Sequence, residues 1–361
     1  MKHIVSALLL ISFLGVGTAP VPSTVLAATT TATPTLAQLI GQKLVVRMEG
    51  ATPSADLLGR IRRGEVSGVI LFGANVTTKA ALIALTAKLH ATAVAGGQPH
   101  FLIATDQEGG SVKRISWAPP TLSPPQMGRI GPASTARTQG ANTGAALHGL
   151  GIDVDYAPVA DVPATTASFM YRQGRTWSFS ARSTAVLSDA FATGLESKHV
   201  VPSMKHFPGL GFATRSTDAY VVTIGVSRSR LAPGLRPYQT AIAHHIPMIM
   251  LSNATYPAYD SVSAAGWSLA ISVTLLRRTL GFRGVTITDS LSGTAAARGI
   301  STGALAVRAA KAGTDMILVT GSEASSKAVY ARLLADARAG LISRTTLRTS
   351  YDRIHALKAS L

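Results

Sequence analysis

Residues 101–110 read Phe-Leu-Ile-Ala-Thr-Asp-Gln-Glu-Gly-Gly, an apolar run that passes directly into acidic, amide and glycine residues. The apolar half, 101–105, is typical of a parallel-sheet strand that is covered on both faces. The polar half starts at Asp106, where such a strand would end. Charged side chains at the carboxyl end of a buried strand are typical of ligand sites in parallel α/β proteins.

Seven further runs have the same apolar character, and most are separated by stretches with helical spacing, such as residues 80–94. The eight predicted strands are residues 43–47, 68–72, 101–105, 153–157, 201–205, 247–251, 284–288 and 315–320. Eight β/α units in about 325 residues predict an α/β fold, a single-domain TIM (β/α)8-barrel. Spacing alone does not establish closure of the sheet, so a doubly wound open sheet is the alternative.

The amino-terminal residues predict export. Lys2 and His3 precede an apolar run, and Val25 and Ala27 supply small residues at the minus-three and minus-one positions of a signal-peptidase site, so residues 1–27 are predicted to be a cleaved signal peptide. The alternative is a membrane anchor, but about 13 apolar residues fall short of the roughly 20 that span a bilayer. Residues 28–35 are only Ala, Thr and Pro and predict a linker, which leaves 36–361 as the folded domain. We therefore expect a secreted or cell-envelope protein with no transmembrane segment in the mature chain.

The composition limits the possible partners. The chain has no cysteine, which excludes disulfides, thiolate metal sites and a lipid-anchored cysteine. Its formal net charge of +17 predicts attraction to anionic polymers of the cell envelope, and a solvated Arg-rich surface is the simpler alternative. The sequence has no aromatic-interleaved basic run or recognition-helix pattern, so nucleic acid is not an expected partner.

Polar residues follow four of the predicted strands, and strand ends of a barrel meet at one rim. These residues are Asp106 to Gly110, Lys205 to Gly209, Ser252 with Asn253, and Asp289 with Ser290. Asp106, Lys205 and His206 would supply donors and acceptors for the hydroxyl groups of a small polar ligand. Asp289 lies between the hydrophobic Ile287 and Leu291 and is a candidate nucleophile, as a glycosidase would need at the anomeric carbon.

Two other kinds of site are not supported. The sequence contains no His-x-His, His-Glu-x-x-His or Asp-rich loop, so no metal site is predicted. Gly209 and Gly211 lack the Gly-Lys-Ser/Thr ending of a phosphate-binding P-loop. No cofactor is expected.

Residues 104–114, Ala-Thr-Asp-Gln-Glu-Gly-Gly-Ser-Val-Lys-Arg, resemble the Asp-Gln-Glu-Gly-Gly-x-Val-x-Arg signature of glycoside hydrolase family 3. Further segments resemble that family in the same order, namely residues 68–73, 156–162, 205–209, 255–260 and 284–292. The resemblance extends over residues 36–361 and is nearest to the bacterial β-N-acetylglucosaminidases, or β-hexosaminidases. It implies a glycosidase that cleaves O-glycosyl bonds by a retaining double displacement. The implied substrate is a carbohydrate, a terminal β-linked N-acetylhexosamine or related sugar of envelope glycans.

The resemblance also implies roles for individual residues. Asp289 corresponds to the nucleophile, and the residues that would hold the sugar are Asp106, Arg114, Arg175, Lys205 and His206. Arg175, within Gly-Arg-Thr-Trp, matches the family's arginine more loosely than the others, and a surface cation is its alternative interpretation.

The acid/base position departs from the family pattern. Family members carry Asp-Ser-His in the loop after Lys-His-Phe-Pro-Gly, whereas this chain has Asp218 at the aspartate and Tyr220 in place of the histidine. A phenol with a pKa near 10 is a poor acid/base at neutral pH beside an imidazole near 6.5. Three interpretations remain open: Asp218 is the acid/base, Tyr220 is the acid/base with a lowered pKa, or the chain is a catalytically impaired sugar-binding pseudoenzyme of the same fold.

Overall fold

The computed structural model describes residues 1, 3 and 33–361, and Pro34–Leu361 form one compact unit. Apart from Met1 and His3, the predicted signal peptide lies outside the described residues, as does the predicted linker up to residue 32. No helix in the described part of the chain is long and apolar enough to cross a bilayer.

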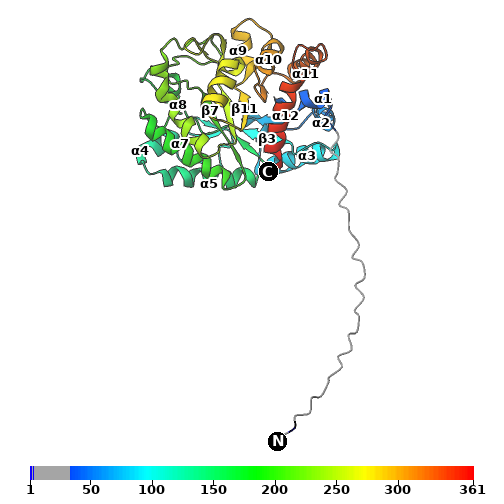
Figure 1. The fold of residues 1–361 in the computed structure, drawn as a ribbon, viewed down its shortest axis with the longest axis horizontal. Helices are drawn as coiled ribbons and strands as arrows, with labels where there is room; N and C mark the ends of the chain where they lie inside the picture. The colour runs from blue at the N-terminus through cyan, green and yellow to red at the C-terminus, as the bar shows by residue number, and fades with distance from the viewer. Residues whose placement is uncertain (2, 4–32) are drawn as a thin grey trace. The chain divides into compact units, whose positions relative to one another are not determined.

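Eight parallel strands form the centre of the unit (Figure 1). In chain order they are β1 (Leu44–Arg47), β2 (Gly68–Leu71), β3 (Leu102–Thr105), β6 (Val154–Asp155), β7 (Val201–Phe207), β8 (Met248–Leu251), β11 (Val285–Thr288) and β12 (Ile317–Val319). They pair in the order β11-β8-β7-β6-β3-β2-β1-β12. Hydrogen bonds from Thr288 N to Met316 O, 3.1 Å, and from Met316 N to Thr286 O, 2.8 Å, join the two ends. The sheet is closed, which confirms the predicted TIM barrel and excludes the open sheet.

All eight predicted strands are present, with shifted ends. The fourth, predicted as 153–157, is the shortest and ends at Asp155, shortly before Pro158, which has no N–H to donate to a neighbouring strand. The fifth continues beyond its predicted end at Lys205, because Phe207 still pairs with Leu251 of β8.

Helices surround the strands in Figure 1. They are α1 (Leu36–Gly41), α2 (Ala55–Arg62), α3 (Lys79–Ala95), α4 (Pro124–Ile130), α5 (Ala133–His148), α6 (Phe169–Arg172), α7 (Ala181–Glu196), α8 (Arg228–Ala243), a π-helix (Ala270–Thr279), α9 (Leu291–Ala297), α10 (Thr302–Lys311), α11 (Glu323–Arg338) and α12 (Arg344–Ala359). Two short hairpins follow barrel strands: β4 (Gln107–Gly109) with β5 (Val112–Lys113), and β9 (Thr255–Tyr256) with β10 (Asp260–Ala264). The predicted helix 80–94 corresponds to α3, which begins after Thr78, whose hydroxyl accepts the Ala81 N–H.

Alternation along each strand divides the core into an inner and an outer part. In β1, Val45 packs with apolar side chains of the other barrel strands, whereas Leu44 and Val46 pack in the cluster that contains the helices. Ile354 and Leu357 of α12 join the inner cluster. Helix α12 therefore seals one end of the barrel, and the other end is left to form a cavity.

A buried carboxylate holds the sealed end together. Asp315 is fully buried and accepts hydrogen bonds from the Thr286 backbone N–H at 2.9 Å and from Arg353 at 3.0 Å, and it also pairs with Arg277. Burial lowers the pKa of Arg277, and the charge of Asp315 only partly opposes that shift. Each charge depends on the others, because an unpaired buried ion loses its hydration without compensation.

Replacing Asp315 by Ala is expected to lower the free energy of unfolding by about 3–5 kcal/mol, because it leaves Arg277 buried without its carboxylate. Urea unfolding followed by circular dichroism measures the change. The matched control is Asp352→Ala, which breaks a half-exposed ion pair with Arg348 within α12. It should change the free energy of unfolding by no more than about 1 kcal/mol. Equal effects of the two substitutions would contradict this role of Asp315.

Candidate active site

A cavity of about 250 Å³ opens at the carboxyl ends of the barrel strands. Its polar wall contains seven of the eight residues predicted for the site, which are Asp106, Arg114, Arg175, Lys205, His206, Asp218 and Asp289. Its apolar wall includes Phe72, Phe169, Met170 and Met250. The eighth predicted residue, Tyr220, does not line the cavity. The strand ends thus bring together groups that lie far apart in the sequence, with 183 positions between Asp106 and Asp289.

Charges of alternating sign form the floor of the cavity. The Lys205 Nζ atom lies 2.7 Å from Asp106 Oδ1 and 2.6 Å from Glu108 Oε1. Arg175 donates two hydrogen bonds to Glu108, from Nε and from one terminal nitrogen, each 2.7 Å long. Arg114 lies 3.4 Å from Asp106 at the other end. We call these five residues the charge chain; three cations and two carboxylates leave it one positive charge in excess.

The charge chain keeps Glu108 and Lys205 ionised. Burial would raise the pKa of Glu108, but the charges of Arg175 and Lys205 and their hydrogen bonds outweigh burial and lower the pKa to about 2. Burial would likewise lower the pKa of Lys205, and the charges of Asp106 and Glu108 raise it instead. The floor therefore presents fixed charged donors and acceptors at neutral pH.

His206 is oriented by a buried aspartate. Its Nδ1 atom lies 2.7 Å from Asp161 Oδ2, and the other carboxylate oxygen of Asp161 accepts the backbone N–H groups of His206, at 3.3 Å, and Leu210, at 2.7 Å. With Nδ1 turned to Asp161, the remaining ring nitrogen, Nε2, is the one available to a ligand.

Asp289 follows β11 and is fixed by its backbone. Its N–H donates to Leu251 O at 2.8 Å, and its Oδ1 accepts the N–H of Ser290 at 2.7 Å. No ion pair engages this carboxylate within residues 33–361. Asp289 is thus a half-buried carboxylate that faces the cavity and has no structural cation partner there.

Asp218 reaches the same cavity from the loop after β7, although the residue as a whole is exposed to solvent. Burial, followed by the negative charge of Asp289, raises the pKa of Asp218 to about 6, although His206 and Arg175 act in the opposite direction. A carboxyl group with this pKa can exchange a proton near neutral pH.

Tyr220 lies outside the cavity lining. Its side chain is 46% exposed, and the Arg215 guanidinium lies 4.4 Å from the ring centroid. The ring therefore packs against another side chain of its own loop and does not form part of the cavity wall.

Gly293 of α9 allows the Asp218 loop to approach. A Cβ atom on Gly293 would lie 2.7 Å from the backbone oxygen of Asp218, which is closer than such atoms come. The absence of a side chain at residue 293 therefore sets how closely Asp218 can approach the segment that begins with Asp289.

Sequence reasoning assigned no role to Glu108 or Asp161, although both lie in the quoted segments. Asp106 and Glu108 are two positions apart in extended chain and so can face the same side. This alternation indicates that Glu108 lies on the same side as Asp106. Asp161 lies beyond the short β6, where no strand pattern indicates its direction.

Comparison with known proteins identifies the family. Residues 35–357 match the glycosyl hydrolase family 3 N terminal domain. An uncharacterized secreted glycosyl hydrolase from Arthroderma benhamiae is 33% identical over 333 residues, which cover 90% of this chain and 94% of that protein. The β-N-acetylhexosaminidase from Beutenbergia cavernae has a TM-score of 0.84 and 29% identity, with 91% of this chain and 99% of that chain covered.

A longer protein of known structure also belongs to this family. The glycoside hydrolase family 3 β-N-acetylglucosaminidase from Paenibacillus sp. str. FPU-7 has a TM-score of 0.86 and 30% identity over 91% of this chain, which spans 63% of that protein. The chain belongs to glycosyl hydrolase family 3 and is a glycosidase built on that family's N-terminal barrel.

Proposed function

We propose that this glycosidase releases a terminal β-linked N-acetylhexosamine, or a related sugar, by a retaining double displacement with Asp289 as nucleophile and Asp218 as acid/base. The observation that carries the proposal is the meeting of these two carboxyl groups in one cavity, where the pKa of one is raised to about 6. A retaining glycosidase requires one carboxylate as nucleophile and a second group that gives and takes a proton.

The first step forms a covalent intermediate. An oxygen of Asp289 attacks the anomeric carbon while the glycosidic C–O bond breaks, and Asp218 gives its proton to the departing oxygen. In the second step Asp218, now ionised, takes a proton from water. The water oxygen attacks the anomeric carbon and releases Asp289 as a carboxylate.

Asp218 is favoured over Tyr220 as acid/base by position and by proton affinity. Asp218 lines the cavity, and its pKa of about 6 allows both protonated and ionised forms near neutral pH. Tyr220 is half-exposed and stacked with Arg215 outside it. Tyr220 is therefore not assigned a catalytic role.

The charge chain is proposed to bind the sugar hydroxyl groups. Asp106 and Lys205 offer an acceptor and a donor, and His206 adds Nε2. Arg114 and Arg175 lie at the two ends of the chain. A cavity of about 250 Å³ is below the roughly 300–1,000 Å³ of sites for larger ligands, which suits one sugar ring and hence action at chain ends.

The choice of sugar rests on relatives. The Beutenbergia and Paenibacillus proteins are a β-N-acetylhexosaminidase and a β-N-acetylglucosaminidase. This chain differs from the family pattern beside the site, at Asp218 to Tyr220, so the sugar is best determined with a panel of substrates.

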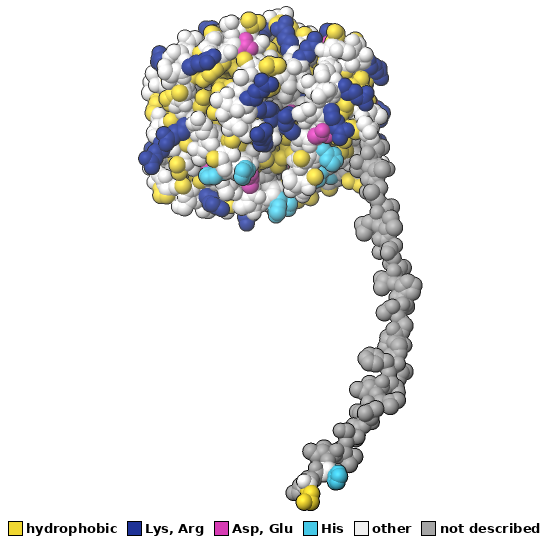
Figure 2. Space-filling model, in the orientation of Figure 1, with side chains coloured by type: hydrophobic (Ala, Val, Ile, Leu, Met, Phe, Trp, Pro, Cys, Tyr) yellow, Lys and Arg dark blue, Asp and Glu magenta, His cyan; other side chains and the backbone are white. Residues whose placement is uncertain are grey.

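Export is proposed from the amino-terminal pattern and from the secreted relative of Arthroderma benhamiae. Lys and Arg side chains are spread over the face shown in Figure 2, where acidic side chains are few. Together with the net charge of +17, this surface is suited to anionic polymers of the cell envelope, which would hold the enzyme near its glycan substrate.

Replacing Asp289 by Asn is expected to lower turnover of the best substrate in a 4-nitrophenyl glycoside panel by at least about 10³-fold, because the nucleophile is removed. Release of 4-nitrophenolate gives the rate. The control is Asp352→Asn, which changes an exposed carboxylate of α12 that does not line the cavity. It should keep wild-type turnover. Turnover unchanged in Asp289→Asn would refute the nucleophile, and sugar binding without turnover by the wild type would indicate a pseudoenzyme.

Asp218 must carry its proton to act as acid, so kcat/KM on a glycoside with an alkyl or sugar leaving group should fall as the pH rises above about 6. Asp218→Asn should lose that pH dependence and reduce kcat/KM by about 10²–10⁴-fold, with a smaller loss on 4-nitrophenyl glycosides, which need little protonation. Tyr220→Phe, which removes only the phenol hydroxyl, should behave as wild type. The reverse pattern, loss in Tyr220→Phe and none in Asp218→Asn, would assign the acid/base to the tyrosine.

Gly293→Ala is expected to lower kcat/KM by about tenfold or more, because its new methyl group pushes the Asp218 backbone away, and misplacement by about 1 Å can cost up to 10²-fold. The matched control is Gly303→Ala in α10, where the added carbon would meet only the Arg332 side chain at an ordinary 3.5 Å. Equal activity of the two variants would show that the Asp218 loop is not held by contact with α9.

A further inference from the structure

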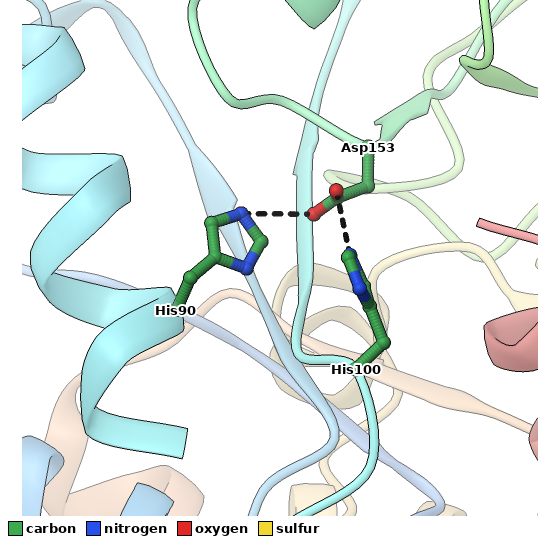
Figure 3. Close-up of side chains that lie close together, drawn as sticks. All are labelled: His90, His100 and Asp153. Atoms are coloured by element: carbon green, nitrogen blue, oxygen red, sulfur yellow. Dashed lines mark hydrogen bonds and ion pairs between the residues drawn. The ribbon is translucent and has the colours of Figure 1, made fainter. Parts of the chain in front are cut away.

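Three side chains with metal-binding atoms lie close together, as Figure 3 shows. His90 lies in α3, His100 in the connection from α3 to β3, and Asp153 directly before β6. Parallel strands begin at one end of a barrel and carry the active site at the other. This group, which we call the His–His–Asp cluster, is therefore separate from the glycosidase site.

The spacing of the cluster suits one metal ion. His90 Nε2 lies 3.5 Å from Asp153 Oδ2, and His100 Nε2 lies 2.9 Å from Asp153 Oδ1. The three ligand atoms are all within 4.8 Å of one another. Two atoms bound to the same tetrahedral zinc, each at about 2.0–2.2 Å, are roughly 3.4 Å apart. Small rotations of the two rings would bring all three atoms onto one ion.

Asp153 is fixed, whereas the two rings retain access to solvent. The backbone N–H of Ile103 donates to Asp153 Oδ2 at 2.7 Å, and the Asp153 backbone bonds to Ile103 O and to the Val201 N–H, each at 2.8 Å. The side chain of Asp153 is 12% exposed, against 25% for His90 and 36% for His100. A rigid carboxylate beside two accessible rings leaves room for an ion and its water ligands.

We propose that the His–His–Asp cluster binds one divalent transition-metal ion of the zinc type, with water completing the coordination. Two imidazoles and one carboxylate match the ligands preferred by zinc and its neighbours, whereas calcium and magnesium prefer oxygen ligands alone. The ion would join α3, the start of β3 and the start of β6. Because the unfolded chain does not hold these three segments together, binding would stabilise the fold.

The alternative is a purely hydrogen-bonded cluster. His90 Nε2 also lies 3.1 Å from Gly151 O, so both rings could carry their protons on Nε2 and donate to Asp153 or to this carbonyl. Metal binding requires the protons on Nδ1 instead. The buried amine of Lys358 would oppose a cation when protonated, and burial lowers its pKa to about 7, so part of that opposition is lost at neutral pH.

Isothermal titration calorimetry with zinc chloride distinguishes the two arrangements, using protein treated with a chelator and then desalted. The wild type should bind one zinc ion per chain and gain thermal stability from it. His90→Ala and His100→Ala should each weaken zinc binding at least tenfold and lose the stabilisation. His148→Ala, which removes another exposed histidine at the end of α5, should bind zinc as the wild type does.

The variants must also remain folded, which turnover of the 4-nitrophenyl substrate and circular dichroism report. His90→Gln and His100→Gln, which preserve side-chain size, replace either alanine variant that fails to fold. No zinc binding by the wild type would overturn the proposal. Wild-type zinc binding in the His90 and His100 variants would also overturn it, because the ion would then occupy another place, such as Asp218 and Asp289 in the cavity.

Discussion

The charge chain is the constraint on which the active site depends. Lys205 in β7 pairs with both Asp106 and Glu108, which follow β3, and Glu108 in turn pairs with Arg175 from the segment between α6 and α7. Each of these charges would be expensive to bury alone, and each is acceptable because its neighbour is of opposite sign. The pairing works only when β7, β6 and β3 lie side by side, so the shape of the cavity floor depends on this strand order.

The two ends of the barrel perform different tasks. At the carboxyl end, Asp218 and Asp289 lack such cation pairing within the described chain and remain available for proton transfer and nucleophilic attack. At the amino end, Asp315 is locked between Arg277, Arg353 and backbone donors, and α12 seals the interior. The two carboxylates proposed to react are thus without a cation partner among the described residues, whereas the stabilising carboxylate of Asp315 is paired with two arginines. The His–His–Asp cluster lies at the stabilising end, which is consistent with a role for its proposed ion in stability.

The strands and the polar rim could be predicted because buried parallel strands appear as apolar runs and because charged residues directly follow them. The choice between Asp218 and Tyr220 could not be made from sequence, since both lie in one loop and only the fold turns one into the cavity and the other under Arg215. Asp161 was missed because its role is to orient His206, 45 positions away. The His–His–Asp cluster has no local spacing motif, because its members come from three segments joined only by the barrel.

The most direct test of the account is the identity of the residue that becomes covalently bound to the sugar. An activated fluoro-sugar that slows hydrolysis of the glycosyl-enzyme allows the intermediate to be isolated, digested and sequenced by mass spectrometry. The account predicts one glycosyl group per chain, attached to Asp289, and none in the Asp289→Asn variant. A sugar attached to Asp218, or turnover without any covalent intermediate, would contradict it.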